Sequence, residues 1–491
     1  MENEIFQERA EKVKKLREAG VNPYPYKFDP TGKSKELTEK YKDLEIGKHL
    51  EEDIYAVAGR IMSLREHGKS AFSHIKDGAG LIQIYFKMDL LGEKQWEIFK
   101  KLDIGDFIGA KGDIFKTRTG EVTIRVRELT LLSKSMLPLP EKWHGLKDVE
   151  IRYRQRYLDM IANPEVKDTF YTRSCIIKLI RKFLEEKSFL EVETPMMHSI
   201  PGGAAAKPFK TFHNALGIEL FMRIAPELYL KRLLVGGFER VFEINRNFRN
   251  EGISIKHNPE FTMLELYQAY ADYNDMMDLT EEIFEYVAKN IFGTTKIVYQ
   301  EKEIDFARPW KRISMSDSVK EVTGIDVLNL SFDEIKAACA GKNIETAPVV
   351  SKGQLINELF EKIVEPTLIQ PTIIKDYPIE ISPLAKKKRD DDMLVERFEV
   401  FIFGRETANA FSELNDPLDQ KERFLKQIDH EKEAELKKVD YDYITALEHG
   451  MPPAGGLGIG IDRMVMFFTN SPSIRDVILF PQMRPKDEEG V

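Results

Sequence analysis

Residues 248–267 read FRNEGISIKHNPEFTMLELY, and this stretch is the most informative part of the chain. Arg249 offers a planar fork that suits a phosphate or a carboxylate. Phe261 can lie against a purine ring, while Glu251 can accept a hydrogen bond from an exocyclic amine. One segment can therefore hold both ends of ATP, which indicates a nucleotide site and not a structural element.

The length and the charge of the chain set the outer limits. With 491 residues, of which 42% are apolar, the chain exceeds what one core usually supports, so we expect two or more domains. The formal net charge of -9 excludes a protein coated in basic surface. Any binding of nucleic acid must then come from local patches and base contacts.

The chain shows no sign of a membrane or secretory segment. No stretch approaches the roughly 20 apolar residues that span a bilayer, and residues 1–4 are too charged for a signal peptide. We expect a cytoplasmic protein with no membrane partner. The two cysteines, Cys175 and Cys339, cannot form a disulfide framework or a zinc cluster, and are expected to be small buried residues.

Residues 51–135 are predicted to form a β-barrel after an N-terminal helical extension, residues 1–50, with a helix at 4–20. Five strands with one helix between the third and fourth is the order of an OB-fold. The strands are expected at 54–61, 71–75, 81–86, 107–115 and 122–132, the helix at 95–102, and turns at Asp77-Gly78 and Thr119-Gly120.

Barrels of this kind bind single-stranded nucleic acid by stacking bases on aromatic rings and reading base edges with amides and carboxylates. Phe72, Gln83 and Glu121 are candidates for these roles. The alternative is equally good at this point: Phe72 would be a core residue, and Gln83 and Glu121 would be solvated strand residues.

Residues 137–140 read LPLP, and paired prolines disfavour helix and central strand, so a linker is expected at 136–150 and a second domain at 151–491. That domain should begin with an amphipathic helix at 170–187 and a strand at 189–195, which Pro195 stops. This unit would either contact a second subunit or pack internally on a sheet.

Two further clusters carry polar chemistry. Glu399 and Glu406 lie seven residues apart on a strand-like run, and carboxylates are natural ligands of Mg²⁺ that also contacts substrate phosphates. The alternative is a pair of surface salt bridges. Residues 456–463 place glycines at alternate positions without the dinucleotide spacing, so the backbone can approach a flat ligand beside Arg463.

Residues 170–195, 248–267 and 456–463 resemble motifs 1, 2 and 3 of the class II aminoacyl-tRNA synthetases, in that order. The similarity is closest to the lysine-specific branch of that family. It implies an α+β protein, with an OB-fold barrel before a catalytic domain built on an antiparallel sheet flanked by helices. The signatures of the lysine branch are residues 201–204, 223–229, 250–254 and 410–416.

The resemblance implies a two-step ligase that forms lysyl-adenylate and pyrophosphate from L-lysine and ATP, then charges the 3′ end of lysine tRNA. It also implies a homodimer with Mg²⁺ as cofactor, held by Glu399 and Glu406. Arg249 would bridge the amino-acid carboxylate and the α-phosphate, with Arg463 as second catalytic residue. The ATP residues would be Arg249, Glu251, His257, Asn258, Phe261, Glu399 and Arg463.

The same resemblance implies a lysine pocket. Lysine brings two ammonium groups and one carboxylate, so the pocket needs one acid for each ammonium group. Glu227 and the backbone of Gly203 would bind the α-ammonium, and Glu413 with Tyr267 the ε-ammonium. The full lysine set would be Gly203, Glu227, Arg249, Glu265, Tyr267, Asn409, Phe411 and Glu413. In the barrel, Phe72, Gln83 and Glu121 would bind the anticodon.

Two alternatives stay open. An aspartyl- or asparaginyl-tRNA synthetase shares the barrel and the three motifs, but Glu413 and Glu227 argue against it. An aspartate-specific relative would need a cation where Glu413 stands. A non-catalytic RNA-binding paralogue would be expected to lack Arg249, Glu399, Glu406 or Arg463. The charged run Lys386 to Arg389 is interpreted as a solvated loop without a role.

Overall fold

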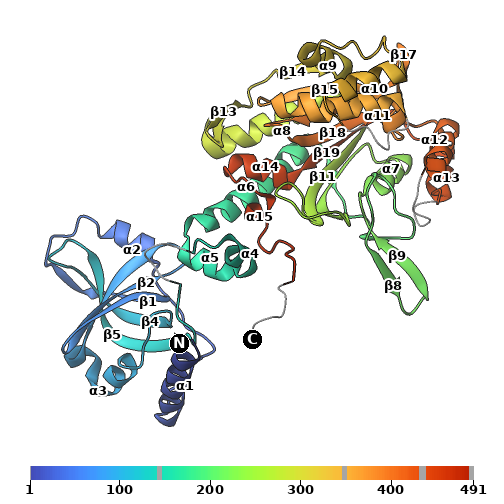
Figure 1. Ribbon diagram of the computed structural model, residues 1–491. Helices are drawn as coiled ribbons and strands as arrows, with labels where there is room; N and C mark the ends of the chain where they lie inside the picture. The colour runs from blue at the N-terminus through green and yellow to red at the C-terminus, as the bar shows by residue number, and fades with distance from the viewer. Residues whose placement is uncertain (1, 141–145, 345–350, 431–437, 486–491) are drawn as a thin grey trace. The chain divides into compact units, whose positions relative to one another are not determined.

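The computed structural model describes residues 2–140, 146–344, 351–430 and 438–485. The chain divides into two compact units, 1–147 and 148–491. Within the described ranges, none of the helices is long and apolar enough to cross a membrane. Figure 1 shows strands β1–β5 in the first unit and the large sheet with its helices in the second.

The first unit is a closed five-stranded barrel of order β1-β2-β3-β5-β4, which confirms the predicted OB-fold. Alternate strand residues such as Ile75, Ile84 and Ile124 fill its core. The predicted helix at 95–102 lies earlier, because it begins directly after β3 with no intervening turn. The elements are α1 (Glu2–Glu18), α2 (Ser34–Lys40), β1 (His49–His67), β2 (Ser70–Lys76), β3 (Leu81–Lys87), α3 (Met88–Phe99), β4 (Phe107–Lys116) and β5 (Val122–Ser133).

A buried ion-pair cluster fastens α1 to the barrel. Arg9 donates to the carbonyl oxygen of Ser135 at 2.8 Å, and Lys12 donates to Asp103 at 2.8 Å. Lys134 is buried between Asp103 and Asp106, and its Nζ donates to Asp106 Oδ2 at 2.7 Å. Pairing of this kind is what makes buried charges tolerable.

The second unit is built on a nine-stranded sheet of order β14-β15-β17-β18-β19-β11-β10-β6, with β16 paired to β17. The sheet is antiparallel except at its two ends, where β14 pairs parallel to β15 and β6 parallel to β10. Its strands are β6 (Leu190–Glu191), β10 (Arg240–Phe248), β11 (Glu260–Ala269), β14 (Lys311–Ser314), β15 (Thr372–Pro378), β16 (Lys387–Lys388), β17 (Asp391–Phe401), β18 (Glu406–Ser412) and β19 (Ala454–Gly460).

The remaining elements surround this sheet. The small strands are β7 (Met197–His198), β8 (Lys210–His213), β9 (Ile218–Met222), β12 (Lys296–Tyr299) and β13 (Lys302–Asp305). The helices are α4 (Val149–Arg154), α5 (Arg156–Ala162), α6 (Glu165–Glu186), α7 (Glu227–Val235), α8 (Tyr273–Phe292), α9 (Met315–Thr323), α10 (Phe332–Gly341), α11 (Lys352–Leu359), α12 (Pro417–His430), α13 (Tyr441–Glu448), α14 (Ile461–Phe468) and α15 (Ile474–Val477).

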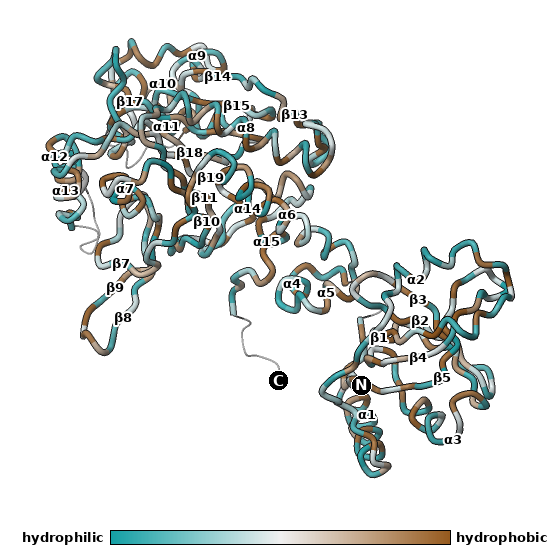
Figure 2. The backbone as a smooth tube through the Cα atoms, turned by 180° about the vertical axis from the view of Figure 1, so that it is seen from behind, coloured by the Kyte–Doolittle hydropathy of each residue, from teal (hydrophilic) through white to brown (hydrophobic). Residues whose placement is uncertain are grey.

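The two faces of the sheet differ in character because side chains alternate along each strand. Leu264, Leu266, Val400 and Ile459 point to one face and share a core with α6, α8 and α14. The hydrophobic colour of α14 marks this side in Figure 2. The intervening residues of the same strands are largely polar and point to the opposite face, which is therefore free for a binding site.

Several local expectations need correction. The predicted strand at 189–195 is only β6: the Val192 N–H still donates to the Phe242 carbonyl at 2.9 Å, but the chain leaves the ladder before it reaches Pro195. Cys175 is exposed, and only Cys339 is buried as expected. The run Lys386 to Arg389 is solvated in part, with the Arg389 side chain 70% exposed, but it is not a loop: β16 pairs with β17, and Arg389 contacts the carboxylates of Asp272 and Glu396.

Candidate active site

A cavity of about 690 Å³ lies over the polar face of the sheet. The strand register arranges its side chains in two rows that run from β11 through β19 and β18 to β17. All members of both rows line the cavity. The first row is Glu265, Gly458, Asn409 and Glu399, and the second is Tyr267, Gly456, Phe411 and Arg397.

The floor of the cavity is glycine backbone. A Cβ on Gly456 would overlap Oε1 of Glu413 and would lie 2.6 Å from the ring of Tyr267. A Cβ on Gly458 would lie 3.0 Å from Met263. Glycine at 456 is therefore a steric requirement of the acids above it, and the alternate glycines of β19 leave room for a ligand.

Two acids form one end of the cavity, and a lysine lies behind them. Glu227 is the first residue of α7, and the backbone of Glu413 is fixed by its N–H donating to the Ala454 carbonyl at 2.8 Å. Lys231, one turn further along α7, donates to Glu227 Oε1 at 2.6 Å and also contacts the Glu413 carboxylate. Burial raises the pKa of both carboxyls, and Lys231 limits that rise.

Glu265 is a third buried acid next to this pair. Its Oε1 accepts from Asn247 at 3.4 Å, and its Oε2 accepts from the Tyr267 hydroxyl at 3.4 Å. Burial and the nearby Glu227 raise the pKa of Glu265 to about 8. Burial likewise raises the pKa of Tyr267 well above its usual value. This wall of the cavity favours a cation, because a cation would let the acids ionise.

Arg249 brings a cation to the cavity wall. Its backbone N–H donates to the Pro259 carbonyl at 2.8 Å, and its guanidinium lies 5.1 Å from the ring centroid of Phe261. The Nε of Arg249 is buried and has no hydrogen-bond partner among the described residues. A buried donor without a partner is costly, so this guanidinium is set to meet an anionic ligand.

Arg463, in the first turn of α14, extends this cationic region. Its guanidinium lies 3.4 Å from His257 Nε2 and 3.5 Å from the carboxylate of Glu406. Partial desolvation and the charge of Arg463 lower the pKa of His257, so its imidazole is neutral near pH 7.

Glu399 and Glu406 are the predicted metal ligands. Glu399 accepts from the Tyr377 hydroxyl at 2.9 Å and from Arg397 Nη2 at 2.5 Å. Burial raises the pKa of Glu399 to about 7, Arg397 opposes the rise, and Glu406 adds to it. Among the described residues, no group of three or more His, Cys, Asp or Glu side chains is placed to hold a metal. Two carboxylates would need substrate oxygens to complete a metal site.

The cavity brings most of the predicted residues together. Those that line it are Gly203, Glu227, Arg249, Glu251, Glu265, Tyr267, Glu399, Glu406, Asn409, Phe411 and Glu413. Of the predicted residues that lie outside its wall, Asn258 is the clearest case. Its amide donates to the Glu260 carbonyl at 2.6 Å, and its Oδ1 accepts from the Gln482 N–H at 3.2 Å. The other three are His257, Phe261 and Arg463.

Sequence reasoning missed two members of the site. Arg397 donates to Asn409 Oδ1 at 3.0 Å and to Glu399, so it orients both side chains. Lys231 is the second. The sequence feature that could have indicated Lys231 is its spacing of four residues from Glu227, which places the two side chains on the same face of a helix.

The barrel carries a separate candidate surface. Gln83 Nε2 donates to Glu121 Oε2 at 2.6 Å, and the other oxygen of Glu121 lies 2.7 Å from His74 Nε2. Phe72 is half-buried on the same face, its ring centroid 4.7 Å from that of Tyr85. The interpretation of Phe72 as a core residue is therefore wrong, and Gln83 and Glu121 are hydrogen-bonded to each other. His74 and Tyr85 are members of this surface that the sequence did not indicate.

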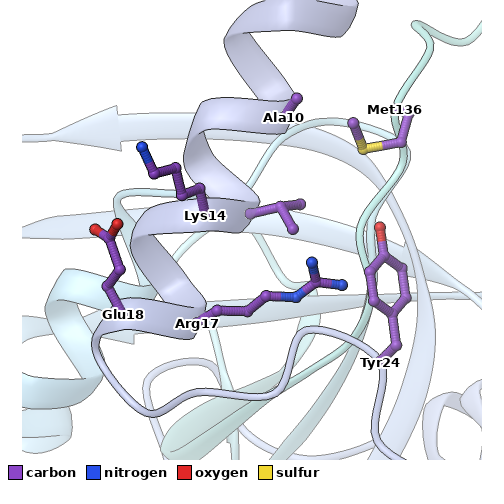
Figure 3. Close-up of a pocket in the computed structure, with 7 residues that line it drawn as sticks. Ala10, Lys14, Arg17, Glu18, Tyr24 and Met136 are labelled. Carbon is purple, nitrogen blue, oxygen red and sulfur yellow. The ribbon is translucent and has the colours of Figure 1, made fainter.

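A smaller hollow of about 390 Å³ lies beside α1 (Figure 3). Its charged side chains, Lys14, Arg17 and Glu18, are exposed to solvent, and Val13 forms an apolar part of its wall. Exposed charges are well screened and recognise ligands weakly. The chemistry of the chain is thus concentrated in the large cavity and on the barrel face.

Family models agree with both regions. A model described as tRNA synthetases class II (D, K and N) matches residues 148–484. A second, described as OB-fold nucleic acid binding domain, matches residues 55–132. The antiparallel sheet with its cavity and the barrel before it are those of a class II tRNA synthetase, a ligase.

Individual relatives narrow this class. The chain is 59% identical over 490 residues to the lysine–tRNA ligase of Pelotomaculum thermopropionicum, covering 99% of this chain and 96% of that protein. It is 58% identical over 490 residues to the lysine–tRNA ligase of Carboxydothermus hydrogenoformans, covering 99% of each chain. The chain belongs to the lysine–tRNA ligase family of class II tRNA synthetases.

Proposed function

We propose that the protein joins L-lysine to the 3′ end of its tRNA, by way of lysyl-adenylate and pyrophosphate formed from lysine and ATP. The observation that carries the choice of amino acid is the pair of buried acids, Glu227 and Glu413, at one end of the cavity. The matched family model covers synthetases for aspartate, lysine and asparagine (D, K and N), so the site must decide among these three. Aspartate or asparagine would leave the Glu413 carboxylate without a cation, which is costly in a buried site.

The lysine pocket uses the two acids at separate points. Glu227, beside the backbone of Gly203, takes the α-ammonium, and Glu413 with Tyr267 takes the ε-ammonium. Glu265 supports the same wall, and Phe411 packs on the aliphatic stem. Asn409, which Arg397 holds in place, orients the lysine carboxylate toward Arg249. The support for this arrangement is that all of these residues except Arg397 were expected from sequence, and all line one cavity.

ATP lies on the Arg249 side. Glu251 and Asn258 hold the adenine end, the former by its carboxylate and the latter by backbone groups, because its side-chain amide is already bonded. Phe261 and Arg463 lie on the two faces of the base, and His257 with Arg463 meets the triphosphate. The cationic character of Arg249 and Arg463 supports this placement, as does the partnerless Nε of Arg249.

The activation step needs no protein nucleophile. A carboxylate oxygen of lysine attacks the α-phosphorus, and the bond to pyrophosphate breaks. Arg249 lies where the carboxylate and the α-phosphate meet, so it stabilises the charge that develops there. The tRNA 3′-hydroxyl then attacks the adenylate carbonyl, and AMP leaves.

Glu399 and Glu406 fit a magnesium ion bound together with substrate phosphates. Both acids line the cavity, and after burial the charge of Glu406 adds to the raised pKa of Glu399, which a shared cation would relieve. When bound, Mg²⁺ neutralises phosphate charge and helps orient the leaving pyrophosphate. Arg397 and Tyr377 hold the Glu399 carboxylate in position for this.

The barrel binds the anticodon. Phe72, which packs beside Tyr85, offers a platform for a base, while Gln83 on β3 and Glu121, the residue before β5, read base edges. His74 lies next to Glu121 and completes the polar part of this surface.

A cytoplasmic homodimer is the expected assembly. Support comes from the edge of the sheet, where β6 ends the strand order and Leu190 is exposed, as is Tyr171 on α6. An open edge strand that carries an exposed apolar side chain is a natural place for a second copy to pair. Sedimentation equilibrium of the full chain tests this, and a single species of monomer mass would reject it.

Pyrophosphate exchange into ATP, measured with each of the twenty amino acids, tests the function as a whole. We expect exchange with lysine alone, because only lysine satisfies both buried acids. Equal or stronger exchange with aspartate or asparagine would overturn the choice of amino acid. The absence of exchange with every amino acid would favour a non-catalytic paralogue.

A further inference from the structure

Lys231 is a buried cation for which the proposed reaction has no role. It lies on α7, is fully shielded from solvent, and is not part of the cavity wall. Lysine is almost never fully buried unless it is paired, because removing an ammonium group from water is costly. The reason for Lys231 must therefore lie in its partners.

The two partners of Lys231 divide their oxygens in the same way. Glu227 Oε1 accepts from Lys231, while its Oε2 lies 3.7 Å from the point where a Cβ would stand on Gly203. Glu413 Oε2 contacts Lys231, while its Oε1 occupies the space where a Cβ would stand on Gly456. Both glycines line the cavity. Each acid is thus held from behind and turns one oxygen toward the ligand space.

The Oε1 of Glu413 has a further property. It is buried and has no hydrogen-bond partner among the described residues. An ionised oxygen in this state needs a donor, and a ligand ammonium in the cavity would supply one.

We infer that Lys231 is a positioning residue of the amino-acid pocket, whose ammonium fixes the Glu227 and Glu413 carboxylates and favours their ionised form for the two ammonium groups of lysine. This inference rests on the proposed function and extends it to a residue that does not touch the substrate. Two carboxylates that share a buried site cannot both stay ionised without a cation. Lys231 provides that cation from the side that the substrate does not occupy.

Other charged and titratable groups around Lys231 do not replace it. From β11, Glu265 adds a further acid, whereas Tyr267 and Tyr443 of α13 are undissociated phenols because burial raises their pKa. Among the described residues, Lys231 is the cation in contact with both acids. Arg397 of β17 acts on Glu227 only at longer range.

The variants Lys231→Met and Lys231→Arg test the inference in ATP–pyrophosphate exchange between about pH 6 and pH 8. In Lys231→Met the acids share a proton, which must leave before an ammonium binds. We expect the KM for lysine to rise at least about tenfold near pH 7, with the KM for ATP nearly unchanged. The kcat/KM for lysine should rise with pH in this variant. Lys231→Arg retains the cation and should keep the pH profile of the unaltered protein.

Lys134→Met is the matched control, since it removes an equally buried lysine from between Asp103 and Asp106 in the barrel. It should lower the Tm and leave the KM for lysine unchanged. A folded Lys231→Met protein with an unaltered KM and pH profile would overturn the inference. If circular dichroism shows that this variant is unfolded, a pH-dependent KM in Lys231→Arg would overturn it instead. Failure of the unaltered protein to activate lysine would reject the proposed function and this inference with it, whereas an unaltered KM and pH profile in Lys231→Met alone would reject only the inference.

Discussion

The barrel face and the catalytic cavity both combine carboxylates with aromatic rings, yet they treat their polar atoms in opposite ways. On the barrel, Gln83, Glu121 and His74 bond to one another, and the Glu121 side chain is 43% exposed. In the cavity, the Glu413 side chain is fully buried and one of its oxygens has no partner among the described residues. The first region can exchange internal bonds for bonds to a base at little cost, whereas the second selects a ligand by charge.

Glu413→Gln should have the largest effect, because it tests whether the cavity selects its ligand by charge. The substitution keeps the shape and removes the charge that the lysine ε-ammonium needs. We expect lysine affinity to fall by about 2 to 5 kcal/mol, roughly 30-fold to several thousand-fold, with ATP affinity little changed. Exchange kinetics measure both. Glu422→Gln, on the exposed face of α12, is the control, and unchanged lysine affinity in Glu413→Gln would remove this residue from the pocket.

Phe72→Ala should produce the next largest effect, on tRNA alone. Loss of one stacking platform costs about 1 to 3 kcal/mol, so the KM for tRNA should rise roughly 5-fold to 150-fold. Amino-acid activation should stay as it was, because the cavity is untouched. Phe107→Ala, another partly exposed barrel phenylalanine, is the control. An equal effect of both variants would argue against a defined base platform.

The buried Glu265 should make the stability of the protein depend on pH, which the exposed carboxylate of the barrel face should not do. Its pKa is about 8 in the folded protein against an ordinary value of 4.5. The proton it retains stabilises the fold fully below about pH 4.5, and this contribution is lost as the pH rises toward 8. Without ligands, Glu265→Gln should therefore match the unaltered protein near pH 5 and exceed its Tm by a few degrees near pH 8.5. If Glu265→Gln and the unaltered protein have the same Tm at pH 8.5 as well as at pH 5, the raised pKa of Glu265 is contradicted.

Glu121→Gln should have the smallest effect, because the barrel network is partly solvated. One charged hydrogen bond is weakened, at a cost of about 0.5 to 1.5 kcal/mol, so tRNA affinity should fall roughly 2-fold to 10-fold. Filter binding of the tRNA measures the change. A loss as large as that of Glu413→Gln on lysine would mean that Glu121 acts as a buried charge after all.

The barrel could be predicted from the sequence because its strands alternate and its turns carry the expected residues. Gly120, at the turn between β4 and β5, has a positive φ of 86°, which glycine adopts readily. The start of α3 was missed, since that helix follows β3 without turn residues and contains a non-helical Gly92. The sequence was sufficient to predict those strands and turns whose conformation depends on residues close together in the chain.

The cavity was predictable only in part. Glu227, Glu265 and Glu413 were expected from their motifs, but the register that aligns β11 with β19 and β18 joins residues far apart in the chain. Periodicity does not report such pairings. Lys231 escaped notice because a lysine in a charged helix normally faces water. Its burial becomes visible only when Glu413 is placed opposite α7.

The glycine pair at 455 and 456 has a mechanical consequence. A Cβ on Gly455 would lie 2.9 Å from Met276 of α8, and one on Gly456 would overlap Glu413 on the other side. At this point β19 therefore has no side chain of its own between its backbone and α8 on one face, or between its backbone and Glu413 on the other. Helix α8 and the acid pocket are separated by the thickness of a single peptide layer, so a shift of that helix toward the sheet is transmitted directly to the acids that would hold the substrate.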